Sequence, residues 1–119
     1  MATHNDLGKK GEQLAAEYLT KKGYEVLERN YRFQKAEIDL IAIKENTLCV
    51  IEVKARSTNV FQNPEDAITQ KKIKLLVKAI DNYVYENDLD VEVRFDIITI
   101  LKTSESLTIQ HFEDAFYHF

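Results

Sequence analysis

The sequence EIDLIAI (residues 37–43) is followed, after the polar residues KENT (44–47), by the sequence LCVIEVK (48–54). Both apolar segments have the length of a β-strand, and the polar residues between them are typical of a hairpin turn. Because apolar residues dominate both segments almost without interruption, we expect both strands to be covered on their two faces. The segments therefore predict the centre of a β-sheet.

Three charged residues interrupt these apolar strands: Asp39 in the first, and Glu52 and Lys54 in the second. Side chains two residues apart in a strand lie on the same face, so Glu52 and Lys54 point the same way, and a neighbouring strand can bring Asp39 beside them. Burying such charges costs several kcal/mol each unless they pair with one another or bind a cation. We therefore expect the three side chains to form one polar patch.

Two interpretations of this patch stay open from the residues alone. Two carboxylates, together with water and backbone oxygen atoms, suit Mg²⁺ or Mn²⁺, and such an ion beside Lys54 favours hydrolysis of a phosphodiester bond. The alternative is an ordinary Glu–Lys ion pair on a half-exposed strand, which is the commoner origin of a Glu-x-Lys sequence.

Helical and strand periodicity fill the rest of the chain. The expected elements are a helix over residues 6–22, an edge strand over 24–33, the two strands quoted above, a helix over 64–86, and strands over 91–101 and 106–112. Gly23 is expected to end the first helix, and Asn63 and Pro64 to start the second. The order α-β-β-β-α-β-β, without a repeat or a domain boundary, predicts one α/β domain over residues 1–119 with a central mixed β-sheet and flanking helices.

Composition excludes several classes of protein. The 119 residues include only 3 Gly and 1 Pro, and no Gly-rich phosphate loop is present, so a P-loop nucleotide site is excluded. The single cysteine, Cys49, excludes a disulfide framework and is compatible with a reducing compartment. No apolar stretch has the length of a membrane span, and the N-terminus lacks a signal-peptide pattern, so we expect a cytoplasmic protein without a membrane partner.

The formal net charge of −4 is unevenly distributed. Residues 36–53, which hold both patch carboxylates, carry −3, the flanking residues 1–35 and 54–78 carry +2 and +4, and residues 79–119 carry −7. A divalent cation would offset the charge of the central segment, and the basic flanks would meet phosphates. An acidic total is therefore compatible with a nucleic-acid partner on one side of the molecule.

Further motifs surround the patch in a fixed order. They are Gly8-x-x-Gly11-Glu12-x-x-Ala15, Arg29-Asn30-Tyr31-Arg32, Glu37-Ile38-Asp39-Leu40-Ile41-Ala42, Ile51-Glu52-Val53-Lys54-x-Arg56, Lys72 and Arg94-Phe95-Asp96. With these motifs the chain resembles the PD-(D/E)xK nuclease superfamily, also called restriction-endonuclease-like, and closely the YraN-like family of small bacterial proteins. The resemblance covers most of the chain and implies the restriction-endonuclease-like fold.

The resemblance implies a Mg²⁺- or Mn²⁺-dependent endonuclease, a hydrolase that cleaves DNA, with branched or structured DNA as one candidate substrate. It implies that Asp39 and Glu52 are metal ligands and that Lys54 is the catalytic lysine. In related archaeal Holliday-junction resolvases a glutamate of the first helix also approaches the metal, and Glu12 holds the matching position. From the residues alone, Glu12 lies at the border of the first helix's apolar face, and an exposed helical acid is the alternative. Those resolvases act as symmetric dimers, which implies a homodimer. The alternative is a module on a nuclease fold that binds nucleic acid or a protein without cutting.

Basic residues supply further candidates. Lys72 lies in the apolar stripe of the second helix, where it either extends from the core edge or reaches the scissile phosphate or the Glu52 carboxylate; the resemblance favours the second role. Lys71 beside it is expected to be solvated. Arg29 and Arg32 can clamp phosphates or solubilise a strand edge. These two arginines, Lys72 and Arg56 are the expected contacts with nucleic acid.

Two positions depart from the family pattern, and the histidines carry no predicted chemistry. Ala36 stands where the family usually has Gly, so the local backbone angle must be one that alanine tolerates. Ile38 replaces the proline of the superfamily's name. The histidines, among them His111, have no metal-ligand spacing, which favours surface or terminal roles.

Overall fold

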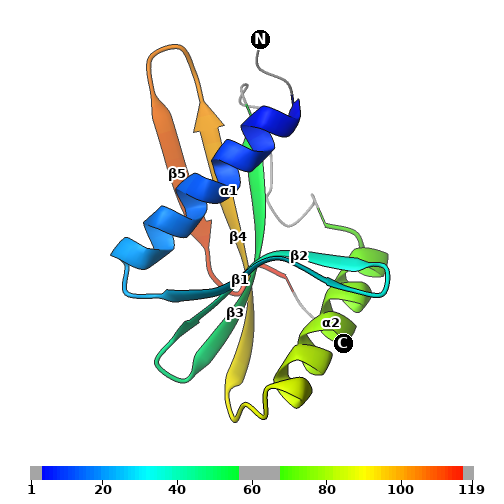
Figure 1. Cartoon of the computed structure of the whole chain (residues 1–119). Helices are drawn as coiled ribbons and strands as arrows, with labels where there is room; N and C mark the ends of the chain where they lie inside the picture. Colours follow the sequence, from blue (N-terminus) through cyan, green and yellow to red (C-terminus); the bar gives the residue numbers. More distant parts are fainter. Residues whose placement is uncertain (1–3, 57–67, 117–119) are drawn as a thin grey trace.

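The computed structural model describes residues 4–56 and 68–116, which form two helices and five strands (Figure 1). The elements are α1 (His4–Lys21), β1 (Glu25–Phe33), β2 (Ala36–Lys44), β3 (Thr47–Arg56), α2 (Gln70–Glu86), β4 (Glu92–Lys102) and β5 (Leu107–Phe112). The predicted order of elements and the α/β class are confirmed. Neither described helix is both long and apolar enough to cross a membrane.

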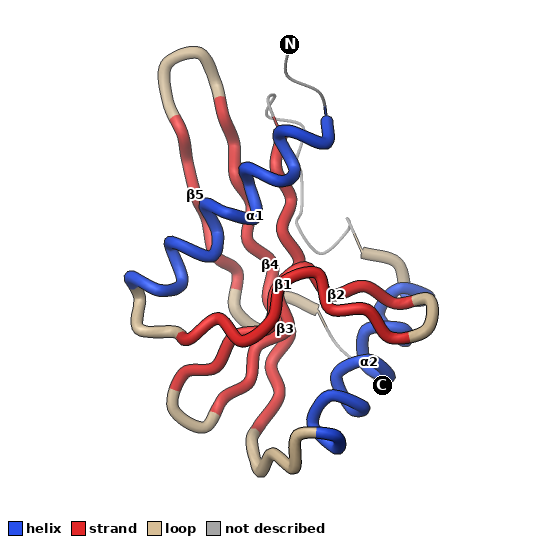
Figure 2. The backbone as a smooth tube through the Cα atoms, in the orientation of Figure 1, coloured by secondary structure: helices blue, strands red, loops and turns tan. Residues whose placement is uncertain are grey.

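The five strands form one mixed sheet in the order β1-β2-β3-β4-β5 (Figure 2). Neighbouring strands are antiparallel except for β3 and β4, which pair in parallel. A parallel pair needs a long crossover connection, and the chain between β3 and β4 contains α2. β1 forms one edge of the sheet, as its interspersed polar residues predict.

The two helices cover opposite faces of the sheet. Leu48 and Val50 of β3 belong to the core cluster that contains the buried side chains of α2. Cys49 and Ile51, the alternate residues of the same strand, belong to the cluster that contains those of α1. All four are fully buried. The prediction that the central strands are covered on both faces is therefore confirmed.

α2 begins later than the sequence predicts. Thr69 is its N-cap, with extended backbone angles and a hydroxyl that accepts a hydrogen bond from the Lys72 amide at 3.1 Å. Ile68 and Ile73 are buried in one cluster at the two positions of a hydrophobic staple. The predicted start of this helix at Pro64 is therefore wrong, because Ile68 and Thr69 are not helical. Pro64 itself lies outside the described residues.

The packing of α1 on β3 depends on Gly11. A Cβ atom at this position would lie 2.7 Å from the Cβ atom of Ala55, which is closer than real Cβ contacts. We expect Gly11→Ala to lower the free energy of unfolding by about 1–3 kcal/mol, measured by urea denaturation. Gly8→Ala is the matched control, because a Cβ there would meet no atom within 4 Å. Equal losses at the two glycines would contradict a packing requirement at Gly11.

Candidate active site

The polar patch lies where β2 and β3 separate. The backbone pairing of the two strands ends at Leu40 and Ile51, so that Asp39 and Glu52, the next residues in register, are no longer paired. Instead, the Asp39 carboxylate accepts a hydrogen bond from the Val53 amide at 2.9 Å. The end of the ladder thus brings both predicted carboxylates to one place.

The β1–β2 hairpin bends at this point. Ile38 packs in the cluster beneath α2 and Leu40 in the cluster beneath α1, although residues two apart in a regular strand share a face. On β1, the residue opposite Asp39 in register is Asn30, whose φ of 54° is a left-handed angle that Asn tolerates better than most residues. Beyond the bend the hairpin extends toward the start of α2 (Figure 2).

Glu52 is the most buried carboxylate of the patch. Its side chain is 1% exposed, and its Oε2 atom lies 2.6 Å from Nζ of Lys72 and 3.9 Å from Nζ of Lys54. Its Oε1 atom is buried and has no hydrogen-bond partner among the described residues. A buried polar atom without a partner costs about 1–3 kcal/mol, and more when it is charged. A cation at this atom would offset that cost.

The charges of the patch work against one another. Burial raises the pKa of both Asp39 and Glu52, and the charge of Asp39 raises the pKa of Glu52 further. Burial also lowers the pKa of Lys54, and the charge of Lys72 adds to that effect. The fold therefore holds two acids and two bases together despite repulsion within each pair. A divalent cation between the acids would relieve the first repulsion.

The donor set suits Mg²⁺ or Mn²⁺ bound by few protein ligands. Carboxylates are the ligands that these ions prefer, and Mg²⁺ is usually bound through one or two carboxylates, with water and phosphate at its other positions. Asp39 and Glu52 meet that requirement. Within residues 4–56 and 68–116, no group of three or more His, Cys, Asp or Glu side chains has an arrangement that could hold a metal by itself. The patch thus fits an ion shared with a substrate.

Glu12 approaches the patch from α1. Burial and the charge of Asp39 raise its pKa, whereas a hydrogen bond with the Asn30 side chain and the charge of Arg29 lower it. Glu12 is thus within electrostatic range of Asp39, on the side expected from its place at the border of the apolar face. Asn30 had no role predicted from the sequence. The feature that could have identified it is the presence of an asparagine inside a strand, where this residue type is depleted.

Lys72, Arg32 and Arg56 have different surroundings. Lys72 reaches the Glu52 carboxylate, which is one of the roles that the sequence leaves open. The Arg32 side chain is 80% exposed and pairs with Glu37 at 2.8 Å. Arg56 is exposed at the end of β3, close enough for its charge to lower the pKa of Lys54. Lys72 thus contacts a patch carboxylate directly.

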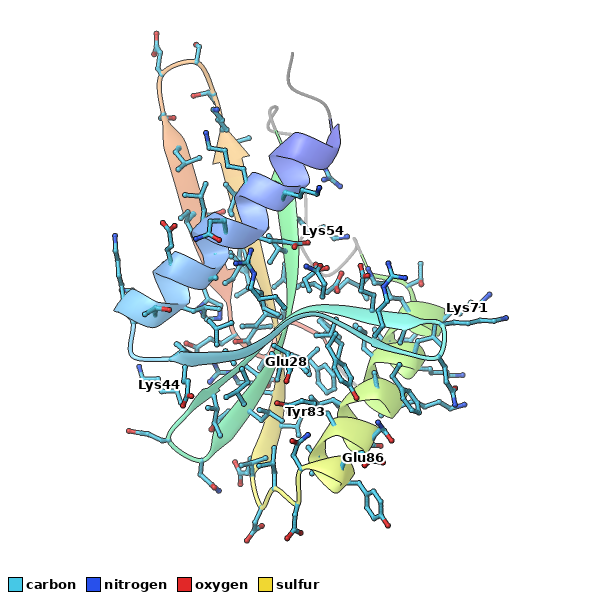
Figure 3. The ribbon with its side chains drawn as sticks, viewed as in Figure 1. Glu28, Lys44, Lys54, Lys71, Tyr83 and Glu86 are labelled. Atoms are coloured by element: carbon cyan, nitrogen blue, oxygen red, sulfur yellow. The ribbon has the colours of Figure 1, made fainter. Side chains whose placement is uncertain are left out.

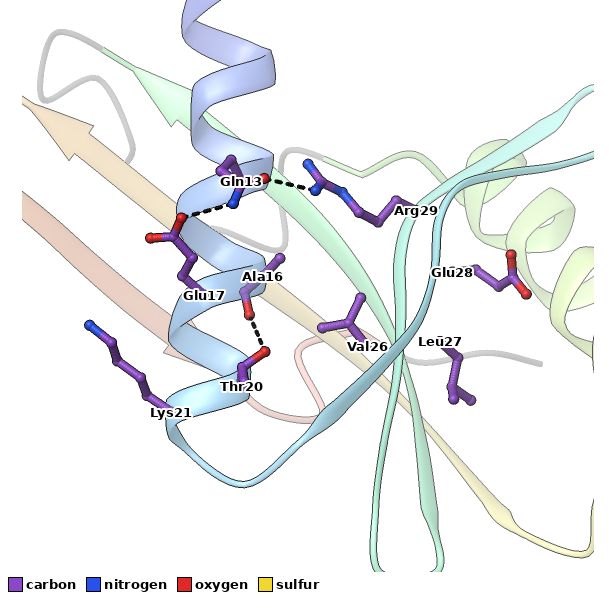
Figure 4. Close-up of a pocket in the computed structure, with 9 residues that line it drawn as sticks. All are labelled: Gln13, Ala16, Glu17, Thr20, Lys21, Val26, Leu27, Glu28 and Arg29. Carbon is purple, nitrogen blue, oxygen red and sulfur yellow. Dashed lines mark hydrogen bonds between the residues drawn. The ribbon is translucent and has the colours of Figure 1, made fainter.

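Arg29 lines a separate cavity of about 630 Å³ between α1 and β1 (Figure 4). Its Nη1 atom donates to Oε1 of Gln13 at 2.8 Å, and the Gln13 amide donates to Glu17 at 2.8 Å. Asp39, Glu52 and Lys54 do not line this cavity. Arg29 is therefore tied to α1, and its charge lowers the pKa of Glu12.

A second cavity, of about 360 Å³, lies directly against the patch. The residues that line it come from the β1–β2 turn, β2 and the start of α2: Lys35, Ala36, Glu37, Asp39, Thr69, Lys71, Lys72, Leu75 and Leu76. Lys71 is exposed at its rim and extends away from the sheet (Figure 3). Ala36 is 5% exposed, and its φ is not left-handed, so glycine is not required there.

A second buried carboxylate, Asp96 of β4, differs from Glu52 in having all its partners. It accepts two hydrogen bonds from Arg94 at 2.9 Å each, one from Nε2 of His111 at 2.7 Å and one from the Asp114 amide at 3.0 Å. Burial works to raise the pKa of Asp96, but these bonds outweigh it and leave the pKa below its ordinary value. Of the surface or terminal roles predicted for His111, the surface role is wrong, because its side chain is 6% exposed and faces Asp96.

Known sequences and structures resemble this chain over most of its length. A UPF0102 protein of Flavobacterium psychrophilum is 60% identical over 119 residues, which is all of both chains. One of Christiangramia forsetii is 59% identical over the same length. Among solved structures, Archaeoglobus fulgidus Hjc, a Holliday junction resolvase from an archaeal hyperthermophile, has 14% sequence identity and a TM-score of 0.48, covering 90% of this chain and 77% of that one.

The family assignment rests on the sequence matches. The model of the uncharacterised protein family UPF0102 matches residues 11–100, a range that includes Glu12, Asp39, Glu52, Lys54 and Lys72. The relatives named above match from end to end. The resemblance to a family of small bacterial proteins that the sequence motifs indicated is confirmed. This chain belongs to the uncharacterised protein family UPF0102.

Proposed function

We propose that this protein is a Mg²⁺- or Mn²⁺-dependent endonuclease that hydrolyses phosphodiester bonds in DNA, with branched or otherwise structured DNA as a candidate substrate. The observation that carries the proposal is the buried Oε1 atom of Glu52, which lacks a hydrogen-bond partner among the described residues and lies in a patch with Asp39 and two lysines. Asp96 indicates that this fold satisfies a buried carboxylate where no ligand is needed. The sequence motifs that resemble PD-(D/E)xK nucleases support the same function.

Asp39 and Glu52 would hold the ion. The Val53 amide fixes the Asp39 carboxylate, and Lys72 fixes Oε2 of Glu52, so that Oε1 is left for the ion. Glu12, whose pKa responds to the charge of Asp39, would act on the ion through a bridging water. When bound, the ion would polarise the scissile phosphoryl group and make a nearby water more acidic.

The two lysines would act on the phosphate. The Lys54 side chain is 18% exposed and burial lowers its pKa, so its ammonium group is partly desolvated, and a charge there stabilises developing negative charge more strongly than in water. Lys72 is 40% exposed and lines the cavity beside Asp39 while it contacts Glu52. It would therefore connect the carboxylate to a phosphate in the cavity.

The proposal is tested by incubating the purified protein with linear, flapped and four-way synthetic DNA in Mg²⁺, in Mn²⁺ and in EDTA. We expect cleavage of at least one substrate with either ion and none with EDTA. Lys54→Ala should slow cleavage by roughly a hundredfold or more, as the loss of a preorganised charge does. Retention of DNA without cleavage would favour the binding module, and a Lys54→Ala variant with unchanged cleavage would contradict the role of Lys54.

Metal binding is also expected to show in thermal stability. An ion that binds the folded state only stabilises it by mass action, by about 2.7 kcal/mol at a hundredfold excess over its dissociation constant, so Mg²⁺ or Mn²⁺ should raise the melting temperature by several degrees. Calorimetry at constant ionic strength measures this shift. Asp39→Asn should abolish most of it, and an equal shift in that variant would place the bound ion elsewhere.

A further inference from the structure

The exposed face of α2 divides into a basic half and an acidic half. Residues 70–80 contain four lysines and no acidic residue. Residues 81–92, which comprise the end of α2, the following loop and the first residue of β4, contain five acidic residues and no basic one. The basic half is the one that begins at the cavity and contacts Glu52 through Lys72. The basic half of α2 therefore lies next to the candidate active site, and the acidic half lies farther along the helix.

Three of these lysines form one stripe. Lys71, Lys74 and Lys78 are all exposed, and their spacing of three and four residues places them on one side of the helix. Seven residues of helix rise by about 10 Å, which equals the axial rise of about three base pairs of duplex DNA. The side chains that pack on the sheet, which include Ile73 and Leu76, lie on another face of α2. The stripe is thus open to a partner along its whole length.

Lys35 extends the basic surface across the cavity. It follows β1 in the turn of the bent hairpin, is exposed, and lines the cavity opposite the start of α2. Lys35, Lys71 and Lys72 thereby surround a cavity whose inner wall includes Asp39. A phosphate in this cavity would lie between these cations and the candidate metal ligand.

We infer that one strand of a DNA duplex runs from the cavity along the stripe Lys71, Lys74 and Lys78, with its phosphates on these lysines, and leaves the protein where Asp81 begins the acidic half. The inference rests on the proposed function for its choice of DNA as the polyanion. The stripe is a DNA-binding surface that the contacts predicted from the sequence did not include. It ends at Asp81, because the acids of residues 81–92 repel phosphates.

The salt dependence of DNA binding tests this path. Binding of a fluorescein-labelled synthetic duplex is measured by anisotropy in EDTA, between about 50 and about 200 mM salt. Each lysine–phosphate contact contributes about 0.9 to the slope of log K against log salt, so Lys74→Gln/Lys78→Gln should reduce the slope by about 2. Lys22→Gln/Lys44→Gln is the matched control with the same change in net charge, and Lys44 lies on the opposite side of the molecule from Lys71 (Figure 3).

Each outcome separates the DNA path from the nuclease proposal. A slope reduced by the Lys74/Lys78 variant alone supports the path, and it does so even if the protein cuts no DNA and the nuclease proposal fails. If the slope of log K against log salt fell equally in the two double variants, net charge alone would account for the effect, and the path would be overturned. An unchanged slope, or no binding of the duplex by the wild-type protein, would overturn it as well, whatever the cleavage assay gives.

Discussion

Replacing Glu52 by Gln is expected to abolish DNA cleavage without lowering the stability of the fold. The substitution keeps the shape of the side chain and removes the charge that would bind the metal. Metal-ion catalysis supplies several kcal/mol of transition-state stabilisation, and each 1.4 kcal/mol corresponds to about a factor of ten in rate, so the rate of cleavage should fall about a thousandfold or more. Single-turnover cleavage of the best DNA substrate in Mg²⁺ measures the loss.

The stability of the Glu52→Gln variant follows from the same surroundings. In the metal-free protein, the Glu52 carboxylate is buried, repelled by Asp39 and left with one oxygen atom without a partner among the described residues. A neutral amide costs less to bury, and its oxygen atom can still accept a hydrogen bond from Lys72. We therefore expect the free energy of unfolding in EDTA to stay equal or rise.

This pair of measurements separates the two interpretations of Glu52 that the sequence leaves open. If Glu52 is simply the acid of the structural Glu-x-Lys ion pair with Lys54, which Lys72 joins in the structure, the Gln variant should lose stability, since breaking a buried pair is strongly destabilising. Glu105→Gln, in the exposed turn between β4 and β5, is the control for the chemistry of the substitution and should change neither quantity. Cleavage that persists in Glu52→Gln would contradict its role as a ligand.

The sequence was sufficient to predict the two central strands and the meeting of their charged residues. Apolar residues on both faces mark a central strand, and the period of two places Glu52 and Lys54 on one side. Both facts depend only on local backbone geometry. The observed contacts of Glu52 with Lys54 and Lys72 follow from this alternation together with the packing of α2 beneath the same face of the sheet.

The bend at Asn30 and Asp39 could not be predicted in the same way. β2 pairs with β3 only from Leu40 onward because its first half packs against α2, and that contact joins segments far apart in the chain. The cavity beside Asp39 and the place of Lys71 at its rim depend on this bend. The environment of His111 likewise depends on the pairing of β5 with β4, which brings His111 opposite Ile98 and within reach of Asp96.

Replacing Asp96 by Ala is expected to lower the free energy of unfolding by about 3–5 kcal/mol, because removing one partner of a buried ion pair leaves the other partner uncompensated. The substitution would leave the Arg94 guanidinium, the His111 ring and the Asp114 amide without their shared acceptor. A domain of this size has roughly 5–15 kcal/mol of stability in total, so the loss would be a large fraction of it. Urea denaturation at neutral pH measures the change, and Asp90→Ala, at an exposed position before β4, is the control.

The pH dependence of the free energy of unfolding tests the role of Asp96 independently. The pKa of Asp96 is lowered in the folded state, so its contribution is complete above its ordinary value of 3.8 and is lost as the pH falls through the lower folded value. The wild-type protein should therefore lose its stability advantage over Asp96→Ala below about pH 4. A difference that stayed constant through this range would contradict the role of the ionised carboxylate. Removing the charge of Asp96 is thus expected to lower the free energy of unfolding, whereas removing that of Glu52 is not. The Asp96 carboxylate has all its partners within the fold, and the Glu52 carboxylate leaves an oxygen atom for a ligand.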